Sequence, residues 1–285
     1  MKDESRETRN ENVLQIYPLP SAERELRGLY LAHDLRQYAR ENSSPYMYAN
    51  FVSSLDGRIA VARPDGSGLM VPKNIANERD WRLYQELAAQ ADLIISSGRY
   101  LREWAAGRAQ EILQTDEPRF ADLREWRTAH GLKPQPDIAI ISSSLDFPIP
   151  DVLTHEGRKA IFFTTANPNG ERVREIEKQA GQVIVAGEKS VEGKLFAARV
   201  RELGYRTVYS GAGPKILRLL LADGVLDRLY LTFANRVLGG NPFATIVEGA
   251  LLEPAVEFKL DALYFDGAGL EGVGQMFVSY IVAKG

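Results

Sequence analysis

Short apolar runs alternate with amphipathic stretches from about residue 45 to the C-terminus. Runs such as 138–141 and 160–163 are continuous and rich in Ile and Phe, which is typical of strands buried on both faces. Between these runs, stretches such as 78–90 and 192–203 place apolar residues at helical spacing. This alternation predicts an α/β fold in which helices flank a mostly parallel, twisted sheet.

The same patterns give the remaining elements. The predicted strands are 46–53, 93–95, 138–141, 160–163, 183–185, 207–209, 228–233, 256–265 and 275–282. The predicted helices are 78–90, 98–113, 120–130, 171–180, 192–203 and one that begins at Pro214. A glycine-rich turn separates the last two strands, so the chain is expected to end in an antiparallel hairpin.

The first 44 residues are more polar than the rest and contain one helical pattern, over 21–38. The pattern changes at Asn42-Ser43-Ser44-Pro45, where the first strand follows. We therefore expect an N-terminal helical arm, residues 1–44, packed on a main domain, residues 45–285. The residues of the arm that approximate one helical face are Leu26, Leu29, Tyr30, Leu35 and Tyr38.

Composition and charge exclude several classes of function. The net charge of −3 gives no electrostatic reason to expect nucleic acid as a partner. The sequence has no apolar run of membrane-spanning length, and its charged N-terminus lacks the apolar core of a signal peptide, so we expect a cytoplasmic protein with no membrane partner.

Without cysteine, thiolate nucleophiles, disulfides and cysteine-ligated zinc are excluded. The three histidines are far apart on polar stretches, which predicts surface residues and no metal site.

Three strand ends carry residues that suit a nucleotide. In segment 205–216 a strand leads through a glycine turn to a helix with Pro at its first position, and backbone N–H groups at such a helix start bind phosphate. Segment 94–100 repeats the arrangement, and segment 140–146 ends a strand in hydroxyls that suit a ribose or a 2′-phosphate. Glycine that serves packing, and ordinary strand-end loops, remain alternative explanations. In open α/β sheets ligands bind outside the carboxyl ends of the strands, which favours a shared site.

A carboxylate follows the strand 46–53. Asp56 lies near Asn50 and Ser53, where it is suited to orient a polar substrate or to take part in proton transfer. The spacing alone favours a simpler interpretation, a turn in which Asp56 bonds its own backbone.

Other motifs lack their structural context. The glycines of 267–272 match a dinucleotide-binding pattern but precede a strand, which indicates a hairpin turn. Segment 187–194 resembles a phosphate loop, yet Leu195 stands where the magnesium-binding hydroxyl belongs. A serine hydrolase of the α/β type is not indicated, because the GxSxG pattern does not occur.

Several of these segments together resemble a known family. Ser53-Ser54-Leu55-Asp56-Gly57-Arg58-Ile59-Ala60, then 91–98, Ser210-Gly211-Ala212-Gly213-Pro214, 226–231 and 238–240 occur in one order. This order resembles the reductase of riboflavin biosynthesis, the C-terminal reductase domain of the bifunctional deaminase-reductase, whose fold is dihydrofolate-reductase-like. The resemblance covers roughly residues 45–283.

The resemblance implies an NADPH-dependent reductase, usually a homodimer, that reduces the ribose of a phosphoribosylamino pyrimidine such as 5-amino-6-(5-phosphoribosylamino)uracil. Hydride transfer suits a chain without thiolates, because the cofactor supplies the reactive carbon. Asp56 would be the catalytic residue, with Asn50 and Ser53 at the substrate. Arg79 or Arg82 would meet a substrate phosphate, although a solvated helical face explains both arginines as well. The residues expected along the cofactor are Ser97, Gly98, Arg99, Ser142, Ser143, Ser210, Gly211, Ala212, Gly213 and Pro214.

The sequence departs from the family at two places. Ser210 stands where the family often has glutamate, which leaves the substrate open, and Arg99 and Tyr100 stand where a threonine is common. The zinc-binding motif of the deaminase has no counterpart. Two alternatives remain: a reductase of the same fold that acts on a dihydropterin or another small molecule, and a non-catalytic nucleotide-binding protein.

Overall fold

The computed structural model describes residues 11–283, which form two compact units. Unit 1 comprises residues up to His33, Tyr48–Tyr84 and the chain from Leu226 onward. Unit 2 comprises Asp34–Met47 and Gln85–Val225. No helix in the described range 11–283 is long and apolar enough to cross a membrane.

Unit 2 is built on a parallel sheet. Its strands are β10 (Thr207–Ser210), β6 (Leu93–Ser97), β7 (Asp137–Ile141), β8 (Ala160–Thr164) and β9 (Gly181–Val185), in that order across the sheet. Every neighbouring pair is parallel. All residues of β7 and β8 are buried, as expected for strands that helices cover on both faces. The parallel sheet predicted from the apolar runs is therefore confirmed in this unit.

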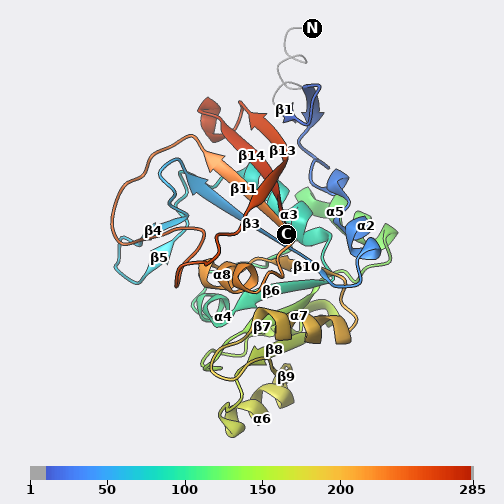
Figure 1. The fold of residues 1–285 in the computed structure, drawn as a ribbon, viewed down its shortest axis with the longest axis vertical. Helices are drawn as coiled ribbons and strands as arrows, with labels where there is room; N and C mark the ends of the chain where they lie inside the picture. Colours follow the sequence, from blue (N-terminus) through green and yellow to red (C-terminus); the bar gives the residue numbers. More distant parts are fainter. Residues whose placement is uncertain (1–10, 284–285) are drawn as a thin grey trace. The chain divides into compact units, whose positions relative to one another are not determined.

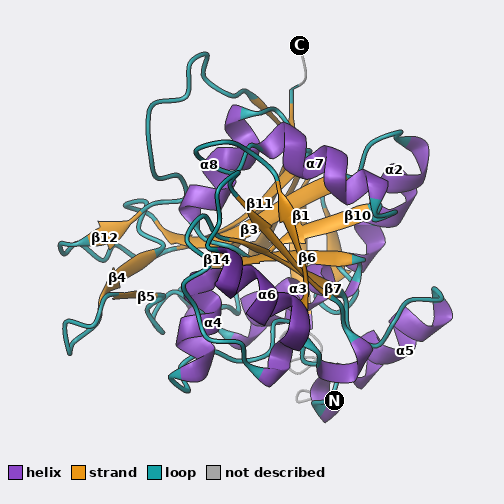
Figure 2. Cartoon of the chain, turned by 90° about the horizontal axis from the view of Figure 1, so that it is seen from below, coloured by secondary structure: helices purple, strands orange, loops and turns teal. Residues whose placement is uncertain are grey.

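Helices lie on both faces of this sheet. Figure 2 shows α7 and α8 on one side of the parallel strands and α4 on the other. The helices of the unit are α2 (Leu35–Glu41), α4 (Gly98–Ala105), α5 (Ala121–Ala129), α6 (Gly170–Gln179), α7 (Gly193–Glu202) and α8 (Pro214–Ala222). Short 3-10 turns lie at Leu31–His33, Pro118–Phe120, Asp151–Leu153, His155–Gly157 and Leu270–Gly272. Helix α4 is shorter than the predicted 98–113, because Gly107 adopts a left-handed conformation (φ 67°) just past its end.

Unit 1 carries a mostly antiparallel sheet. Its strand order is β2 (Ala22–Glu25), β1 (Asn12–Tyr17), β13 (Phe258–Asp266), β14 (Gln275–Val282), β11 (Arg228–Ala234) and β3 (Tyr46–Ser54). Only the pair of β3 with β11 is parallel in this part of the chain. Figure 1 shows β11, β14 and β13 side by side. The predicted C-terminal hairpin, β13 with β14, is confirmed.

Two further elements complete the list. A small three-stranded sheet in unit 1 contains β12 (Phe243–Ala244), β4 (Ala60–Ala62) and β5 (Leu69–Met70). Helix α3 (Glu78–Ala89) begins in unit 1 and ends in unit 2.

The helix predicted over 21–38 is wrong for most of its length. Ala22–Glu25 is strand β2, and the only α-helix of the segment is α2, from Leu35. Strand β2 pairs with β1, and β1 pairs with β13 near the C-terminus. Gly28 adopts φ 82° and interrupts the helical pattern. Long-range pairing therefore overrides a weak local helical preference. The part of the predicted arm before residue 11 lies outside the described residues.

His33 also differs from the sequence-based expectation, because it is not a surface residue. Its Nδ1 lies 2.9 Å from the Tyr230 hydroxyl and its Nε2 lies 3.0 Å from the Tyr264 hydroxyl. Burial, aided by the charge of Arg228, lowers the pKa of His33 to about 3. His33 is therefore neutral at pH 7. The other two histidines, His130 and His155, are exposed, as predicted.

Unit 1 is expected to lose stability as the pH falls below about 6.5. The unfolded His33 takes up a proton near its ordinary pKa, whereas the folded residue resists protonation until about pH 3. Between these values the loss approaches roughly 1.4 kcal/mol per pH unit. The measurement is the urea midpoint across this range, in which His33→Gln should show a flatter pH dependence than the unchanged chain. His130→Gln is the control, and equal slopes for all three proteins would contradict the prediction.

Candidate active site

The strand ends predicted to hold a cofactor lie side by side in unit 2. Strand β6 pairs with β10 on one side, Ile95 opposite Ser210, and with β7 on the other, Ser97 opposite Ile141. The structure therefore brings the three predicted segments to one edge of the parallel sheet, at its carboxyl end. This is the edge at which open α/β sheets bind their ligands.

The turn after β10 leads directly into α8. Gly213 is the N-cap residue and Pro214 opens the helix, as predicted. Gly213 adopts φ −78°, which any residue tolerates, and a Cβ built on it would meet no atom within 4 Å. Neither backbone conformation nor packing requires glycine here. Glycine is common at a helix N-cap, and here it also leaves room for a ligand to approach the helix N-terminus.

Ser210 ends β10 as a buried residue. Its Oγ has no hydrogen-bond partner among the described residues. A buried hydroxyl without a partner is costly, and water or a ligand usually supplies the missing bond. The unpartnered Ser210 hydroxyl is suited to bond a nucleotide bound beside Gly211 and Ala212.

The turn after β6 has a different reason for its glycine. A Cβ on Gly98 would lie 2.9 Å from Phe147 Cδ1, so packing alone demands glycine there. Ser97 is the N-cap of α4 but makes no side-chain capping bond, and Arg99 is exposed. The packing alternative raised from the sequence is thus correct for Gly98.

The loop after β7 is held by its own hydroxyl. Ser142 Oγ accepts a hydrogen bond from the Leu145 N–H at 3.1 Å, whereas the Ser143 side chain is exposed. A cavity of about 500 Å³ opens beside this loop, bordered by Arg102 from α4 and Arg172 from α6. Both guanidinium groups donate to backbone carbonyls of the loop. This cavity adds two cations to the edge at which the three strand ends meet.

Asp56 lies in unit 1 and uses both carboxylate oxygens. Oδ1 accepts from the Ser54 hydroxyl (2.5 Å) and the Leu238 N–H (3.2 Å). Oδ2 accepts from the Gly239 N–H (2.8 Å) and from Arg58 Nη1 (2.7 Å). The Ser54 hydroxyl, with the backbone N–H groups and Arg58, holds the pKa of Asp56 well below its ordinary value. Asp56 is thus ionised and holds the loop at Leu238 and Gly239, which is far away in the sequence. The interpretation that the spacing favoured, a turn in which Asp56 bonds its own backbone, is wrong.

The loop that Asp56 holds borders a cavity of about 300 Å³. Leu238, Gly239 and Gly240 line one side of it, and Val61 and Asn74 lie on the other. Gly239 and Gly240 adopt φ 65° and 86°, which side chains other than glycine rarely tolerate. Arg58 also donates to the Gly240 carbonyl, so Asp56 and Arg58 together fix the wall of this cavity.

The structure does not bring Asn50 and Ser53 together. β3 pairs with β11 in an unbroken register, with Asn50 opposite Tyr230 and Ser53 opposite Phe233. Successive residues of a strand point to opposite faces, so these two side chains, three positions apart, lie on opposite faces of the sheet. Ser53 Oγ donates to its neighbour's carbonyl and is buried. Their roles at the substrate stay a prediction.

Arg79 and Arg82 do not lie on a solvated helical face. Arg82 is buried, and the Arg79 side chain is only 18% exposed. Arg79 Nε donates to both carboxylate oxygens of Asp266, at 3.0 and 2.8 Å, and Asp266 is fully buried. The solvated-face alternative is therefore wrong, and Arg79 has a structural partner.

The sequence-based reasoning missed Asp80. This residue of α3 is buried, and burial raises its pKa to about 6, against the opposing effect of a hydrogen bond with Thr232 of β11. The signal was present in the sequence, because Asp80, Leu83 and Leu87 share one helical stripe. A carboxyl group with a pKa near neutrality is suited to proton exchange.

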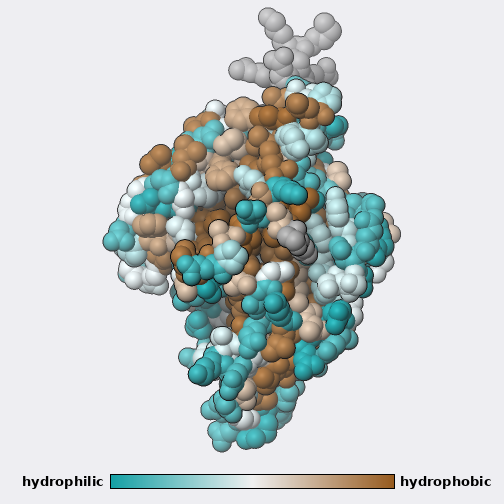
Figure 3. Space-filling view, in the orientation of Figure 1, coloured by the Kyte–Doolittle hydropathy of each residue, from teal (hydrophilic) through white to brown (hydrophobic). Residues whose placement is uncertain are grey.

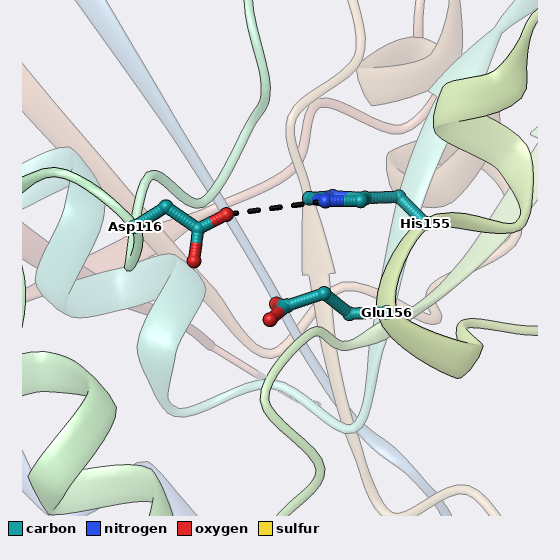
Figure 4. Close-up of side chains that lie close together, drawn as sticks. All are labelled: Asp116, His155 and Glu156. Carbon is teal, nitrogen blue, oxygen red and sulfur yellow. Dashed lines mark ion pairs between the residues drawn. The ribbon is translucent and has the colours of Figure 1, made fainter.

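Unit 2 contains a second charged cluster. Figure 4 shows Asp116, His155 and Glu156 close together, with 3.9 Å between His155 Nε2 and Asp116 Oδ2. Arg124 Nη2 pairs with Glu156 at 2.6 Å and also with Asp116. A guanidinium already supplies the positive charge that a metal ion would bring to this group.

Comparison with known proteins assigns the family. The model of the RibD C-terminal domain matches residues 45–270. A 2,5-diamino-6-ribosylamino-4(3H)-pyrimidinone 5′-phosphate reductase of Archaeoglobus fulgidus is 28% identical over 72% of the chain and 87% of its own length. A reductase of the same name from Methanothermobacter thermautotrophicus is 26% identical over 79% of the chain and 95% of its own length.

Solved structures share the fold. A pyrimidine reductase-like protein of Corynebacterium diphtheriae superposes with a TM-score of 0.63 at 20% identity, over 85% of this chain and 93% of that one. The riboflavin biosynthesis reductase Rib7 of Saccharomyces cerevisiae gives a TM-score of 0.52 at 15% identity, over 88% of this chain and 100% of that one. The predicted α/β fold is confirmed, and these solved structures share it. The chain belongs to the RibD C-terminal domain family, the reductase family of riboflavin biosynthesis that its ordered motifs indicated.

Proposed function

We propose that this protein is an NADPH-dependent reductase that converts a phosphoribosylamino pyrimidine into the corresponding ribitylamino compound. Two reductases named for a pyrimidinone of this kind are its relatives over most of its length. In the ring-opened imine form of the substrate, hydride adds to C1 of the sugar and a proton adds to the nitrogen. The cofactor supplies the hydride, and the protein supplies positioning and polarity.

Gly213 is the observation that carries the cofactor part of the proposal. Neither the backbone angles nor the packing demand glycine at this position, and the N–H groups at the start of α8 lie beside open space. A pyrophosphate seated there meets backbone donors and the positive end of a helix. The unpartnered hydroxyl of Ser210, just before the turn, offers a further bond to the same ligand.

The choice of NADPH over NADH rests on the cavity beside the β7 loop. Arg102 and Arg172 border it, and the Ser142 hydroxyl, at the start of the same loop, lies close to Gly98. Guanidinium groups bind phosphate more strongly than neutral donors do. We assign the 2′-phosphate of the cofactor to this cavity.

Replacing Arg102 by glutamine is expected to raise the KM for NADPH about tenfold, which corresponds to one charge-assisted hydrogen bond of about 1.4 kcal/mol. The KM for NADH should not change, because NADH has no 2′-phosphate. Steady-state kinetics with both cofactors measures the effect. Arg108→Gln, which breaks an exposed pair with Glu103 in the same unit, is the matched control. A parallel rise for both cofactors would contradict the assignment.

The substrate is tested by oxidation of NADPH in the presence of candidate compounds. Two pyrimidines are compared as substrates. One is the 2,5-diamino-pyrimidinone for which the two relatives are named, and the other is 5-amino-6-(5-phosphoribosylamino)uracil. A dihydropterin is the third compound. Oxidation with either pyrimidine supports the proposal. Oxidation with the dihydropterin alone would overturn it in favour of the pterin alternative, and NADPH binding without oxidation would identify a non-catalytic protein.

A further inference from the structure

The cavity of about 300 Å³ in unit 1 has a lining without charge. Among the described residues that border it, none is acidic or basic. Besides Gly239 and Gly240, the lining consists of apolar side chains and two side-chain amides: Val61, Ala62, Pro72, Leu238 and Pro242, with Asn74 and Asn241. Figure 3 shows apolar and polar residues mixed over β4 and β5, and β4 carries Val61 and Ala62. A volume of this size is enough for a small ring system.

The segments that line this cavity are fixed relative to one another. Leu238 packs against a small buried cluster that contains Ile75, the residue after Asn74. Arg236 Nη1 donates to the Asn74 carbonyl oxygen at 2.9 Å, which ties the Asn74 segment to the loop of Leu238. Asp56 accepts from the N–H of Leu238 as well. A cavity whose walls are held in place before binding loses little conformational entropy when a ligand enters.

The small three-stranded sheet supplies the apolar wall of Val61 and Ala62. Val61 of β4 pairs with Phe243 of β12 and with Met70 of β5. Because Phe243 directly follows Pro242, this pairing fixes Val61 relative to the end of the glycine loop. The three segments that line the cavity are therefore joined by backbone pairing, by a side-chain bond and by a shared apolar cluster.

Several hydrogen-bonding groups at the cavity are unused. The side-chain amides of Asn74 and Asn241 have no partner among the described residues, and the same holds for the N–H groups of Gly240 and Asn241. A side-chain amide has a carbonyl acceptor on one side and an NH₂ donor on the other. Since no neighbour holds these two amides, each can turn to present either side to a ligand.

We propose that this cavity binds the pyrimidine ring of the substrate, with Asn74 and Asn241 bonding its polar edge. The inference rests on the proposed function and adds the residues that recognise the ring. A pyrimidinone is flat and uncharged, so its faces suit the apolar walls. The N3–H and C4=O groups in its plane form the donor and acceptor pair that one amide bonds with two hydrogen bonds. A phosphate would instead require cations, which the lining does not supply.

The two amides meet the position at which the candidate pyrimidines differ. At C2 the diamino-pyrimidinone carries an amino group, which donates, whereas the uracil carries a carbonyl, which accepts. Asparagine bonds either one after a half-turn of its amide. Aspartate only accepts, so it keeps a bond to the amino group and repels the carbonyl. An Asn→Asp change at the C2 position therefore converts a tolerant site into one that selects the 2-amino ring.

The ring without sugar or phosphate tests where it binds. 2,5,6-Triaminopyrimidin-4-one and 5,6-diaminouracil are titrated separately into the full-length chain, and amide NMR signals are followed. We expect signals of Gly240, of Asn241 and of the Asn74 side chain to shift, with a Kd of about 1 mM for a ligand this small. Shifts that leave these three residues unchanged would overturn the proposal.

Asn74→Asp and Asn241→Asp test the hydrogen bonds themselves. In at least one of these variants the Kd of the 2-oxo ring, divided by that of the 2-amino ring, should rise at least tenfold. Asn42→Asp adds the same charge at an exposed helix end in unit 2 and should leave both Kd values within about twofold, because the charge is screened by solvent. A ratio that stays unchanged in both cavity variants, with circular dichroism showing that they fold, would refute a role of the amides.

Turnover separates this proposal from the proposed function. Ring binding at the cavity, without oxidation of NADPH in the presence of either full pyrimidine substrate, would contradict the proposed function alone. Oxidation of NADPH, with ring-induced shifts only among residues of unit 2, would contradict the ring site alone. If both proposals hold, the variant that selects the 2-amino ring should show the same preference, at least tenfold, in kcat/KM.

Discussion

Replacing Arg79 by methionine is expected to destabilise the protein by about 3 kcal/mol, because it leaves the buried Asp266 carboxylate without its cation. Asp266 also accepts a hydrogen bond from Gln275, which Asn77 bonds in turn. These bonds join the start of α3 to the C-terminal hairpin. Methionine keeps most of the volume of the arginine stem, so the loss reports on the charge and not on a cavity. Urea denaturation measures it.

A double variant and a surface pair control this experiment. Asp266→Asn removes the buried charge, so its combination with Arg79→Met should recover a large part of the loss. Arg119→Met, at an exposed pair with Glu117, should change stability by less than about 1 kcal/mol. If Arg79→Met kept full stability and raised the KM for the pyrimidine substrate, Arg79 would have the substrate role expected from the sequence instead.

The parts of the fold that depend on local pattern could be predicted from the sequence. The strands 138–141 and 160–163 are continuous apolar runs, and the structure buries both completely. The three cofactor segments were predicted at strand ends, and the parallel order of β10, β6 and β7 then brings them together. The C-terminal hairpin followed from its glycine-rich turn. In each case the signal lies within about ten residues of the element.

Long-range pairing explains most of what the sequence did not reveal. Asp56 binds Leu238, 182 positions away, and Arg79 binds Asp266, 187 positions away. β1 is a strand because it pairs with β13, and no local pattern encodes that partner. The separation of Asn50 and Ser53 is different. A spacing of three within a strand places two side chains on opposite faces, so this separation could have been foreseen from the sequence.

The contacts of Asp56 also change the role that the sequence suggested for it. A carboxylate whose pKa is held low by a hydroxyl, two N–H groups and a guanidinium donates no proton near pH 7. Its four bonds instead fix the loop of Leu238 and Gly239 against Arg58. We therefore propose Asp56 as a positioning residue for the cavity in unit 1.

Asp56→Asn is expected to lower kcat for the pyrimidine substrate about 100-fold while the Kd for NADPH changes by less than about threefold. The asparagine NH₂ group would face donors from which the carboxylate accepted hydrogen bonds, so the loop relaxes. The substrate then loses alignment, and a displacement of about 1 Å is enough for a loss of this size. The predicted cofactor residues belong to unit 2, whereas Asp56 and the loop it holds belong to unit 1. Single-turnover kinetics measures the rate, and fluorescence titration measures the affinity.

The pH profile separates a positioning role from proton transfer. If Asp56 only holds the loop, the residual activity of Asp56→Asn keeps the pH dependence of the unchanged enzyme, because the group that exchanges the proton is still present. If Asp56 were the proton donor, its loss would remove one limb of that profile. Asp65→Asn is the matched control: Asp65 also has a lowered pKa, set by hydrogen bonds from Ser67 within its own exposed turn. Turnover by Asp56→Asn equal to that of Asp65→Asn would show that the anchored loop is not part of the active site.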